Sequence, residues 1–312
     1  NIDAMRKIKA GMEEVKRTNP NLVEHAAKRA FGDFKPAAVA DPPPARTWTK
    51  AAKERAERIR RRATLRVGMP RVLNMYSLAP FFTAYLQSLG VPPRNLVFSD
   101  CTSEALYREG ARRGSIDPCF PSKVCIAHVH NLIYVLHMKE PLTHIVFPMV
   151  DALPSPLRNT QANRACPTVT ATPEAVKAAF TKEGDVFKEH GITYLAPFVD
   201  FADEQLLEQQ MFHGFQAMLG LSREENERAC IEGWKALRGF DKELRDRGRE
   251  TLLELERDFR VGIVVLGRPY HNDPGINHEI LVELQKRGYP ILTQDTLPVD
   301  DETLAPLFRE DI

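Results

Sequence analysis

Apolar positions divide the chain into a helical first part and a later part in which short apolar runs alternate with helices. In the first part, three polar stretches have helical spacing, with a proline linker between the second and third: residues 2–18, 21–31 and 48–62. From residue 65, four short runs predict strands: residues 65–69, 95–99, 144–149 and 192–198. The run at 144–149 has the continuous apolar character of a parallel sheet.

Helical stretches separate these runs and then extend into a long helical region. Helices are predicted at residues 79–89, 103–113, 122–137 and 174–180. Residues 203–259 are mostly helical, and Ser222 with Glu225 predicts a capping box for the second helix of this region. A strand at 261–266, a helix at 275–287 and a strand at 291–294 then begin a second α/β unit.

The alternation predicts an α/β fold with parallel sheets, preceded by a helical N-terminal segment. We expect four segments, taken in chain order: a helical lead and linker (1–63), a first α/β domain (64–202), a helical crossover (203–259) and the truncated start of a second α/β domain (260–312). The chain begins at Asn1 and stops soon after its second unit opens, so we expect it to be a segment of a longer polypeptide.

Composition excludes several classes of partner. The 312 residues include 43 Lys and Arg against 42 Asp and Glu, so a formal net charge of +1 gives no reason to expect nucleic acid or a membrane surface. Apolar runs stay well below the roughly 20 residues that span a bilayer. Five cysteines, an odd number, favour a reducing cytoplasm over a secreted disulfide framework. We interpret the basic run at 60–62 as a solvated helix face rather than a contact for acidic groups.

Two cysteine-proline sequences carry the strongest chemical signal. They are Asp117-Pro118-Cys119-Phe120-Pro121 and Arg164-Ala165-Cys166-Pro167-Thr168, and each follows an apolar run. Proline stiffens the backbone beside each thiol, which suits a metal ligand or a nucleophile. Zinc usually shows paired C-x-x-C ligands, whereas an iron–sulfur cluster tolerates ligands far apart in sequence. The spacing leaves two readings open, a shared iron–sulfur centre or two structural thiols.

The other thiols and one histidine have simpler interpretations. We expect Cys101 to be a loop residue beside the site, although it could add a ligand. Cys125 and Cys230 lie within predicted helices and are expected to pack in the core. His128 could approach Cys125 or a cluster, but a hydrogen-bonded buried histidine is the favoured interpretation.

A second candidate site is the ten-residue segment 266–275. It follows a buried strand and precedes a helix, where backbone N–H groups can bind an anion. Arg268 and His271 add donors that suit a phosphate or a carboxylate. The segment has neither the dinucleotide G-x-G-x-x-G fingerprint nor a Walker A sequence. An ordinary long strand–helix loop is the alternative, and the length of the segment favours function slightly.

Three segments of the chain resemble a known family. Tyr76-Ser77-Leu78-Ala79-Pro80-Phe81-Phe82, residues 114–123 around Cys119, and Gly267-Arg268-Pro269-Tyr270-His271 are similar to the acyl-CoA dehydratase activase-related proteins. These proteins in turn resemble the 2-hydroxyacyl-CoA dehydratase subunits and the double-cubane cluster proteins. The resemblance covers roughly residues 65–312 and is most specific around Cys119 and Arg268.

The resemblance implies a fold, a cofactor and a chemistry. It implies Rossmann- or flavodoxin-like three-layer α/β/α domains, with a [4Fe–4S] cluster bound by Cys119 and Cys166. A third ligand is expected in the later part of the second domain, beyond Ile312. In the dehydratase relatives an ATP-dependent activase injects an electron, and water then leaves a 2-hydroxyacyl-CoA through a ketyl radical. Lys123 could balance thiolate charge, while Arg268 and His271 could receive a CoA phosphate or thioester oxygen.

These expectations define three competing functions. The first is an iron–sulfur redox domain that accepts electrons from an ATP-dependent activase, which is either a domain or a subunit. The electrons would serve a low-potential reduction or a dehydration, with an acyl-CoA as the candidate substrate. The second is a non-catalytic cluster-binding or docking module of a larger activase-related protein or oligomer. The third is a zinc site or no metal, with structural thiols.

Overall fold

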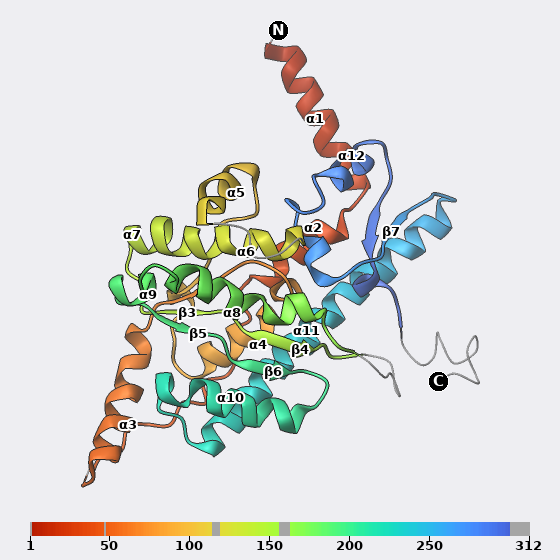
Figure 1. Ribbon diagram of the computed structural model, residues 1–312. Coiled ribbons are helices and arrows are strands. Elements are labelled where there is room, and N and C mark those ends of the chain that lie inside the picture. Colours follow the sequence, from red (N-terminus) through yellow and green to blue (C-terminus); the bar gives the residue numbers. More distant parts are fainter. Residues whose placement is uncertain (1, 47, 114–118, 156–162, 300–312) are drawn as a thin grey trace.

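The computed structural model describes residues 2–46, 48–113, 119–155 and 163–299. Three helices lead the chain, as the sequence predicts: α1 (Ile2–Thr18), α2 (Leu22–Ala30) and α3 (Lys50–Arg61). The side chain of Asn21 caps α2 by accepting from the backbone N–H of Glu24 at 3.0 Å. Helix α1 projects from the body of the molecule, whereas α2 lies inside it (Figure 1).

Four parallel strands form the main sheet in the order β2-β1-β3-β5. Their bounds are β1 (Val67–Met69), β2 (Leu96–Phe98), β3 (His144–Val146) and β5 (Thr193–Leu195). The chain runs from β1 outward to β2 and then crosses back to β3, so the strand order reverses between β1 and β3. The predicted parallel α/β fold is confirmed.

Two of these strands continue beyond a proline. After Pro148 the chain resumes as β4 (Met149–Ala152), and after Pro197 as β6 (Phe198–Asp200), and β4 pairs in parallel with β6. Proline has no N–H to donate, so the ladder is interrupted at both positions. The Met149 N–H still donates to the Pro197 carbonyl at 2.9 Å. The sequence predicted single strands at 144–149 and 192–198, and the second segments extend the sheet at its carboxyl edge.

Helices cover both faces of the sheet, which gives three α/β/α layers. On one face lie α4 (Met75–Ser88), α10 (Glu204–Leu219) and α11 (Arg223–Arg257). On the other lie α6 (Phe120–Asn131), α8 (Pro167–Thr181) and α9 (Val186–Glu189). Val146 packs in the first core and its neighbour Ile145 in the second, as strand alternation requires. The remaining short helices are α5 (Glu104–Gly110), α7 (His137–Lys139), η1 (Arg62–Thr64), η2 (Pro93–Asn95), η3 (Ala111–Arg113) and the π-turn η4 (Leu132–Leu136).

A glycine in β1 permits close packing on the second face. A Cβ built on Gly68 would lie 2.9 Å from Leu142 Cδ1 and 3.2 Å from Leu132 Cδ2. A larger residue would have to displace these leucine side chains, so glycine lets them pack directly against the strand.

Two helices begin earlier than the sequence predicts. Helix α4 starts at Met75 rather than 79, and α8 starts at Pro167 rather than 174. Each contains an internal proline, Pro80 or Pro173, near the start that the sequence predicted. Both prolines are buried, so tertiary packing offsets the missing backbone hydrogen bond.

Helix α11 is anchored by a buried ion pair at its start. Ser222 Oγ accepts from the Glu225 N–H at 3.1 Å, as predicted for the cap. The Glu225 carboxylate does not complete the capping box but binds the Arg62 guanidinium through two oxygens. Arg62 is only 2% exposed, so the prediction of a solvated face at 60–62 is wrong for this residue.

The second α/β unit is a parallel pair of strands joined through two short helices: β7 (Ile263–Val265), η5 (Pro269–Asn272), α12 (Ile280–Lys286) and β8 (Ile291–Thr293). The 3₁₀ turn η6 (Gln294–Thr296) follows. Helix α12 begins at residue 280 rather than 275, because His278 and Glu279 adopt left-handed backbone angles that interrupt a helix.

The helical lead binds this second unit to the rest of the chain. Asn21, at the start of α2, forms a β-bridge with Ile291 of β8. The Gln285 side-chain nitrogen donates to the Asn19 carbonyl at 2.6 Å. The first of the four predicted segments therefore packs against the last. The division of the chain into these segments stays a prediction.

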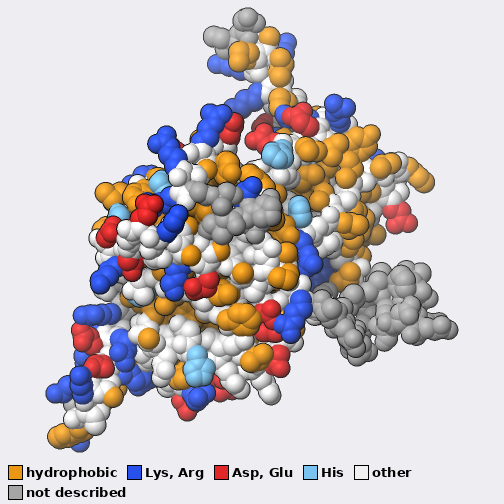
Figure 2. All heavy atoms as spheres, in the orientation of Figure 1, with side chains coloured by type: hydrophobic (Ala, Val, Ile, Leu, Met, Phe, Trp, Pro, Cys, Tyr) orange, Lys and Arg blue, Asp and Glu red, His pale blue; other side chains and the backbone are white. Residues whose placement is uncertain are grey.

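The surface of the second unit is partly apolar. Hydrophobic side chains gather over β7 and α12 in Figure 2, and Leu266 and Val264 are 75% and 41% exposed. Within the described ranges, no helix has both the length and the apolar character to cross a bilayer.

Candidate functional site

The two cysteines of the cysteine-proline sequences occupy matching positions. Cys119 is the N-cap of α6 and Cys166 the N-cap of α8, and each has extended backbone angles. Pro121 and Pro167 stand in the first turns of these helices, where a missing N–H costs nothing. Asp117 and Pro118 lie outside the described residues.

Helices α6 and α8 lie side by side, so the two thiols stand at neighbouring helix ends. The Ser122 and Thr172 hydroxyls form a hydrogen bond between the two helices. Both helices are followed in the chain by strands of the parallel sheet, β3 and β5. Their N-termini therefore face the carboxyl edge of that sheet, where open α/β folds bind ligands.

Cys166 is held in place by the end of β4. The Ala165 N–H donates to the Asp151 carbonyl at 2.8 Å, and the Arg164 guanidinium pairs with the Asp151 carboxylate. The backbone N–H groups of Val169 and then Thr168 lower the pKa of the Cys166 thiol. The thiolate form is thus favoured by the N-terminus of α8, with a smaller contribution from Arg268.

The hydroxyl group of Tyr270, in the Gly-Arg-Pro-Tyr-His segment, is affected by the charges of both thiols. Burial raises the pKa of the Tyr270 hydroxyl, and the charges of Cys119 and Cys166 raise it further. Both thiols must therefore lie within electrostatic range of one hydroxyl group. The Tyr270 ring and Cys166 also pack against the same apolar core. Cys119 and Cys166, 47 positions apart in the chain, therefore both influence one tyrosine hydroxyl.

Arg268 and His271, the predicted anion-binding residues, differ in whether their side-chain nitrogens are available to a ligand. The Arg268 N–H donates to His271 Nδ1 at 3.0 Å, so this ring nitrogen caps the η5 turn. A Cβ at Gly267 would lie 2.8 Å from the same nitrogen, which explains the glycine. The Arg268 side chain is exposed, and its Nη1 donates to the Arg164 carbonyl at 3.4 Å. Lys123 is half-buried near the start of α6.

The remaining thiols match their expected structural positions. Cys125 is fully buried, and its Sγ donates to the Pro121 carbonyl at 3.2 Å. Burial raises the pKa of the Cys125 thiol, and likewise that of Cys230 on α11. Cys101 is exposed in the loop after β2.

His128 belongs to a buried hydrogen-bond network, as the favoured interpretation expected. Its Nδ1 and Nε2 lie 2.7 Å from Ser99 Oγ and 2.9 Å from Thr102 Oγ1. Thr102 donates to the Asp273 carboxylate, so its oxygen accepts from His128 Nε2–H, and Nδ1 accepts from Ser99. Burial lowers the pKa of His128 to about 3, which keeps the ring neutral.

Asp273 connects this network to the second unit. The Gly275 N–H donates to its carboxylate at 2.9 Å, and the residue is fully buried. A Cβ at Gly275 would lie 2.4 Å from the Thr102 carbonyl oxygen, so the two loops approach too closely for any other residue. Burial raises the pKa of Asp273, and its hydrogen bonds oppose this shift.

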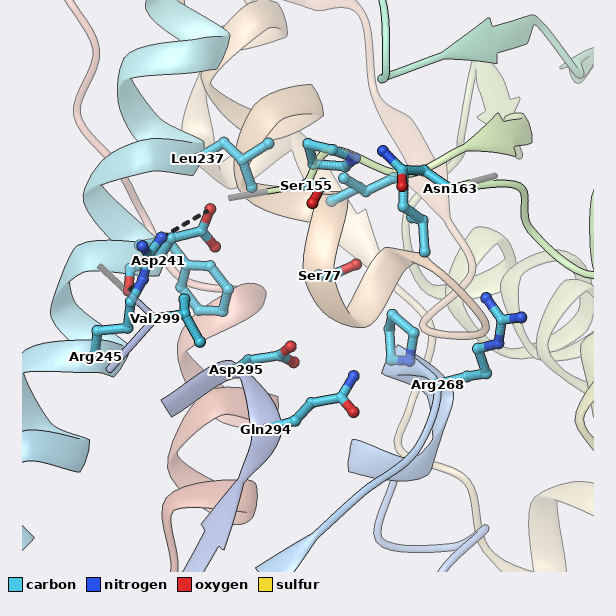
Figure 3. Close-up of a pocket in the computed structure, with 15 residues that line it drawn as sticks. Ser77, Ser155, Asn163, Leu237, Asp241, Arg245, Arg268, Gln294, Asp295 and Val299 are labelled. Carbon is cyan, nitrogen blue, oxygen red and sulfur yellow. Dashed lines mark hydrogen bonds and ion pairs between the residues drawn. The ribbon is translucent and has the colours of Figure 1, made fainter. Parts of the chain in front are cut away.

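A cavity of about 410 Å³ opens where the strand order reverses (Figure 3). Ser77 from the first turn of α4, Asn163 from the chain after β4, and Arg268 from the η5 loop border it. Leu237 and Phe240 of α11 supply apolar surface. The cavity thus combines a helix N-terminus, an exposed guanidinium and an apolar wall at the position where α/β folds usually bind ligands.

Two carboxyl groups line this cavity, each from a different element. Asp241 lies on α11 and Asp295 on η6, with Arg245 nearby (Figure 3). Burial raises the pKa of Asp241 to about 6, with Arg245 opposing and Asp295 adding to the shift. Burial also raises the pKa of Asp295. The pair can therefore hold a proton near neutral pH.

Comparison with known families gives a clear result. The family model described as the CoA enzyme activase uncharacterised domain matches residues 66–297, well over half of the chain. The chain belongs to this family. The match begins at β1 and ends just after β8, so it includes both cysteine-proline sequences and the Gly-Arg-Pro-Tyr-His segment. No curated protein and no solved structure matched the chain.

The residues of this activase-related chain fit an iron–sulfur cluster in part. Two thiols at helix N-termini are suitable donors for iron, and backbone N–H groups near the sulfur stabilise thiolate charge. Among the described residues, no group of three or more His, Cys, Asp or Glu side chains is arranged to hold a metal ion. The described residues therefore offer two candidate ligands, Cys119 and Cys166, and no third one beside them.

Sequence reasoning missed several residues of the site. Tyr270 lay within a recognised segment, but the effect of both thiols on its hydroxyl depends on chain packing. Asp273 and Thr102 are 171 positions apart, and only the close approach at Gly275 joins them. Asp241 stands in a long polar helix where nothing in the local pattern distinguishes it. The one local signal was the Asp-Pro-Gly sequence at 273–275, because proline and glycine indicate an unusual backbone conformation.

Proposed function

We propose that this chain is the cysteine-bearing redox part of an activase-related system, in which Cys119 and Cys166 bind one iron–sulfur cluster of the [4Fe–4S] type. The supporting observation is that the two cysteines are the N-cap residues of neighbouring helices and that both their charges affect the same tyrosine hydroxyl. A third ligand comes from outside the described residues. When bound, the cluster supplies one-electron chemistry at low potential.

The chain's own groups would control the charge and the environment of the two thiols. The N–H groups of the first α8 turn and the Arg268 guanidinium favour the Cys166 thiolate. Tyr270 and Cys166 are both partly buried against the same apolar core. Lys123, near the start of α6, could add a compensating positive charge close to Cys119.

We propose an acyl-CoA as the substrate class and an ATP-dependent activase as the electron donor. The family assignment supports both, because the family is named for CoA enzyme activases. The 410 Å³ cavity supports the first, since Arg268 can bind a phosphate or a thioester oxygen while Leu237 and Phe240 accept an apolar group. The Nδ1 of His271 accepts a hydrogen bond from the Arg268 backbone N–H, so only the Nε2 of His271 is available to a ligand.

Iron and acid-labile sulfide in anaerobically purified protein test the cluster. We expect both to be present in the wild type and lost in Cys119→Ser and Cys166→Ser, because each removes a ligand without removing core volume. Cys230→Ser is the matched control and should retain iron, since Cys230 is buried in α11. Equal iron loss in all three variants, with folding intact by circular dichroism, would contradict the assignment.

A second candidate function is a docking module that binds a cluster but performs no catalysis. It is favoured by the incomplete ligand set among the described residues. Activase, ATP and a reductant would be added to the cluster-loaded protein, followed by electron paramagnetic resonance and an assay of acyl-CoA turnover. A reduced-cluster signal without turnover would favour the docking module, whereas turnover would establish the redox enzyme.

A further inference from the structure

One side of the 410 Å³ cavity is formed by a single face of helix α11. Leu237, Asp241 and Arg245 follow one another at intervals of four residues, so they lie on the same face of the helix, and all three line the cavity. Arg268 borders the cavity from the η5 loop, and Figure 3 shows it on the opposite side of the view from Asp241. A ligand in this cavity therefore meets the Asp241 carboxyl group at a place other than the Arg268 guanidinium.

A second carboxyl group reaches the cavity because η6 packs closely on α11. A Cβ on Gly248 of α11 would overlap the Thr296 carbonyl oxygen of η6, so glycine permits this close approach. Asp295 lies in the same turn and accepts hydrogen bonds from the side chains of Gln294 and Asn272. The packing of the turn on the helix therefore holds the Asp295 carboxylate within electrostatic range of α11.

Asp241 can change its charge near neutral pH. The charged residues that line the cavity, among those that the structure describes, are Asp241, Asp295, Arg245 and Arg268. The Nη2 of Arg245 lies 4.0 Å from Asp241 Oδ2, which is beyond hydrogen-bond distance. Burial raises the pKa of Asp241 to about 6, Arg245 opposes this shift, and Asp295 adds to it. Below that pH the carboxyl group is protonated and can donate a hydrogen bond, which a carboxylate cannot do.

We propose that the protonated Asp241 carboxyl donates a hydrogen bond to the carbonyl oxygen of a thioester bound in this cavity. A thioester oxygen is neutral and only accepts hydrogen bonds, so it is matched by a carboxylic acid rather than by a carboxylate. The acyl chain would pack on Leu237 and Phe240, which supply the apolar wall beside Asp241. This inference rests on the proposed acyl-CoA substrate class. It assigns the thioester oxygen to Asp241 and leaves Arg268 for a CoA phosphate.

Short thioesters test this assignment without the CoA phosphates. The probes are S-butyryl-N-acetylcysteamine and its thioether, S-butyl-N-acetylcysteamine, which lacks the carbonyl oxygen. Their affinities would be measured by NMR titration at a series of pH values. Thioester affinity should fall about tenfold between pH 5 and pH 8, because ionisation of Asp241 removes one hydrogen bond. The thioether should bind with the same affinity throughout.

Variants separate this role of Asp241 from a structural one. The amide group of Asp241→Asn donates at every pH, so thioester binding should be retained and should lose its pH dependence. Asp295→Asn should move the midpoint of the pH dependence below that of the wild type, and Arg245→Gln should move it above, because these residues raise and lower the pKa of Asp241. Asp246→Asn is the matched control. Asp246 lies on the same helix, pairs with Lys242 and is not among the described residues that line the cavity, so the midpoint should not change.

Three results would overturn the inference. They are equal affinity of the thioester and the thioether at every pH, a pH dependence that persists in Asp241→Asn, and no binding of the thioester at millimolar concentration. Butyryl-CoA that binds at pH 7, together with any of these results, would leave the proposed substrate class in place and contradict the role of Asp241 alone. No binding of butyryl-CoA would contradict the substrate class as well.

Discussion

At the scale of single residues, the thiols differ because their surroundings favour different protonation states. Cys166 caps α8, where backbone N–H groups stabilise negative charge, whereas Cys125 and Cys230 are buried among apolar groups. A lowered pKa gives more thiolate at neutral pH, and a raised pKa gives less. Position in the fold thus separates a candidate ligand from two core residues of the same type.

Alkylation of the iron-free protein by iodoacetamide should reflect this difference. The rate at Cys166 should reach its half-maximal value below pH 8.5, the midpoint of an ordinary cysteine, because its pKa is lowered. Arg268→Gln should move that midpoint upward, since Arg268 favours the thiolate. Peptide mass spectrometry across a pH series measures both effects.

Cys230 serves as the internal control in the same samples. It should stay unmodified until the protein unfolds, because it is buried and its pKa is raised. A midpoint for Cys166 at or above pH 8.5 would show that the first turn of α8 does not stabilise its thiolate.

Local sequence identified the candidate ligands because a proline lies beside each of them. Cys119 and Cys166 were singled out because proline restricts the backbone beside each thiol, and their position as helix N-caps was not predicted. Tyr270 and Asp273 acquire their surroundings from segments more than 100 positions away in the chain. No short pattern records such a contact, so these residues could not be assigned from the sequence.

At the scale of elements, a buried ion pair joins the end of the helical lead to the long helix α11. Arg62 binds Glu225, and its Nε donates to the Leu219 carbonyl at 2.8 Å. The amphipathic pattern located these helices correctly, but it placed Arg62 on a solvated face. The error arises because local charge density does not show which basic residue finds a buried acidic partner.

Replacement of Arg62 should therefore destabilise the protein strongly. Arg62→Met should lower the free energy of unfolding by about 3–5 kcal/mol, because it leaves the Glu225 carboxylate buried without its main partner. Arg61→Met is the matched control, since Arg61 is exposed and pairs with Glu57 on the same helix, and should cost less than about 1 kcal/mol. Urea unfolding followed by circular dichroism measures both, and equal effects would contradict the buried pair.

The two internal prolines show a second limit of local patterns. The predicted helices start close to Pro80 and Pro173, yet α4 and α8 begin earlier and continue through these residues. The parallel strands were predicted more reliably, because continuous apolar runs are needed wherever both faces of a sheet are covered.

At the scale of the whole molecule, the network of Ser99, His128, Thr102 and Asp273 connects the two α/β units. His128 lies on α6, the helix that Cys119 caps, and Asp273 lies three residues after Tyr270. One set of buried hydrogen bonds therefore fixes the position of the second unit relative to the cysteine site.

This network should make stability depend on pH. The pKa of His128 is lowered to about 3 in the folded protein, against about 6.5 in the unfolded chain, so its contribution is present above pH 6.5 and is lost as pH falls. Between pH 6.5 and 5.0 the free energy of unfolding should fall by about 1.5 kcal/mol more in the wild type than in His128→Gln. Urea titrations at the two pH values test this, and parallel losses would exclude a buried neutral histidine.

The central claim is that Cys119 and Cys166 bind one shared cluster, and the iron content of the double variant tests it most directly. Iron per protein would be measured after anaerobic reconstitution of the wild type, Cys119→Ser, Cys166→Ser and the double variant. We predict that each single variant loses as much iron as the double variant, because one centre needs both thiolates. Single variants that each retain about half of the wild-type iron, with the remainder lost only in the double variant, would contradict a shared cluster.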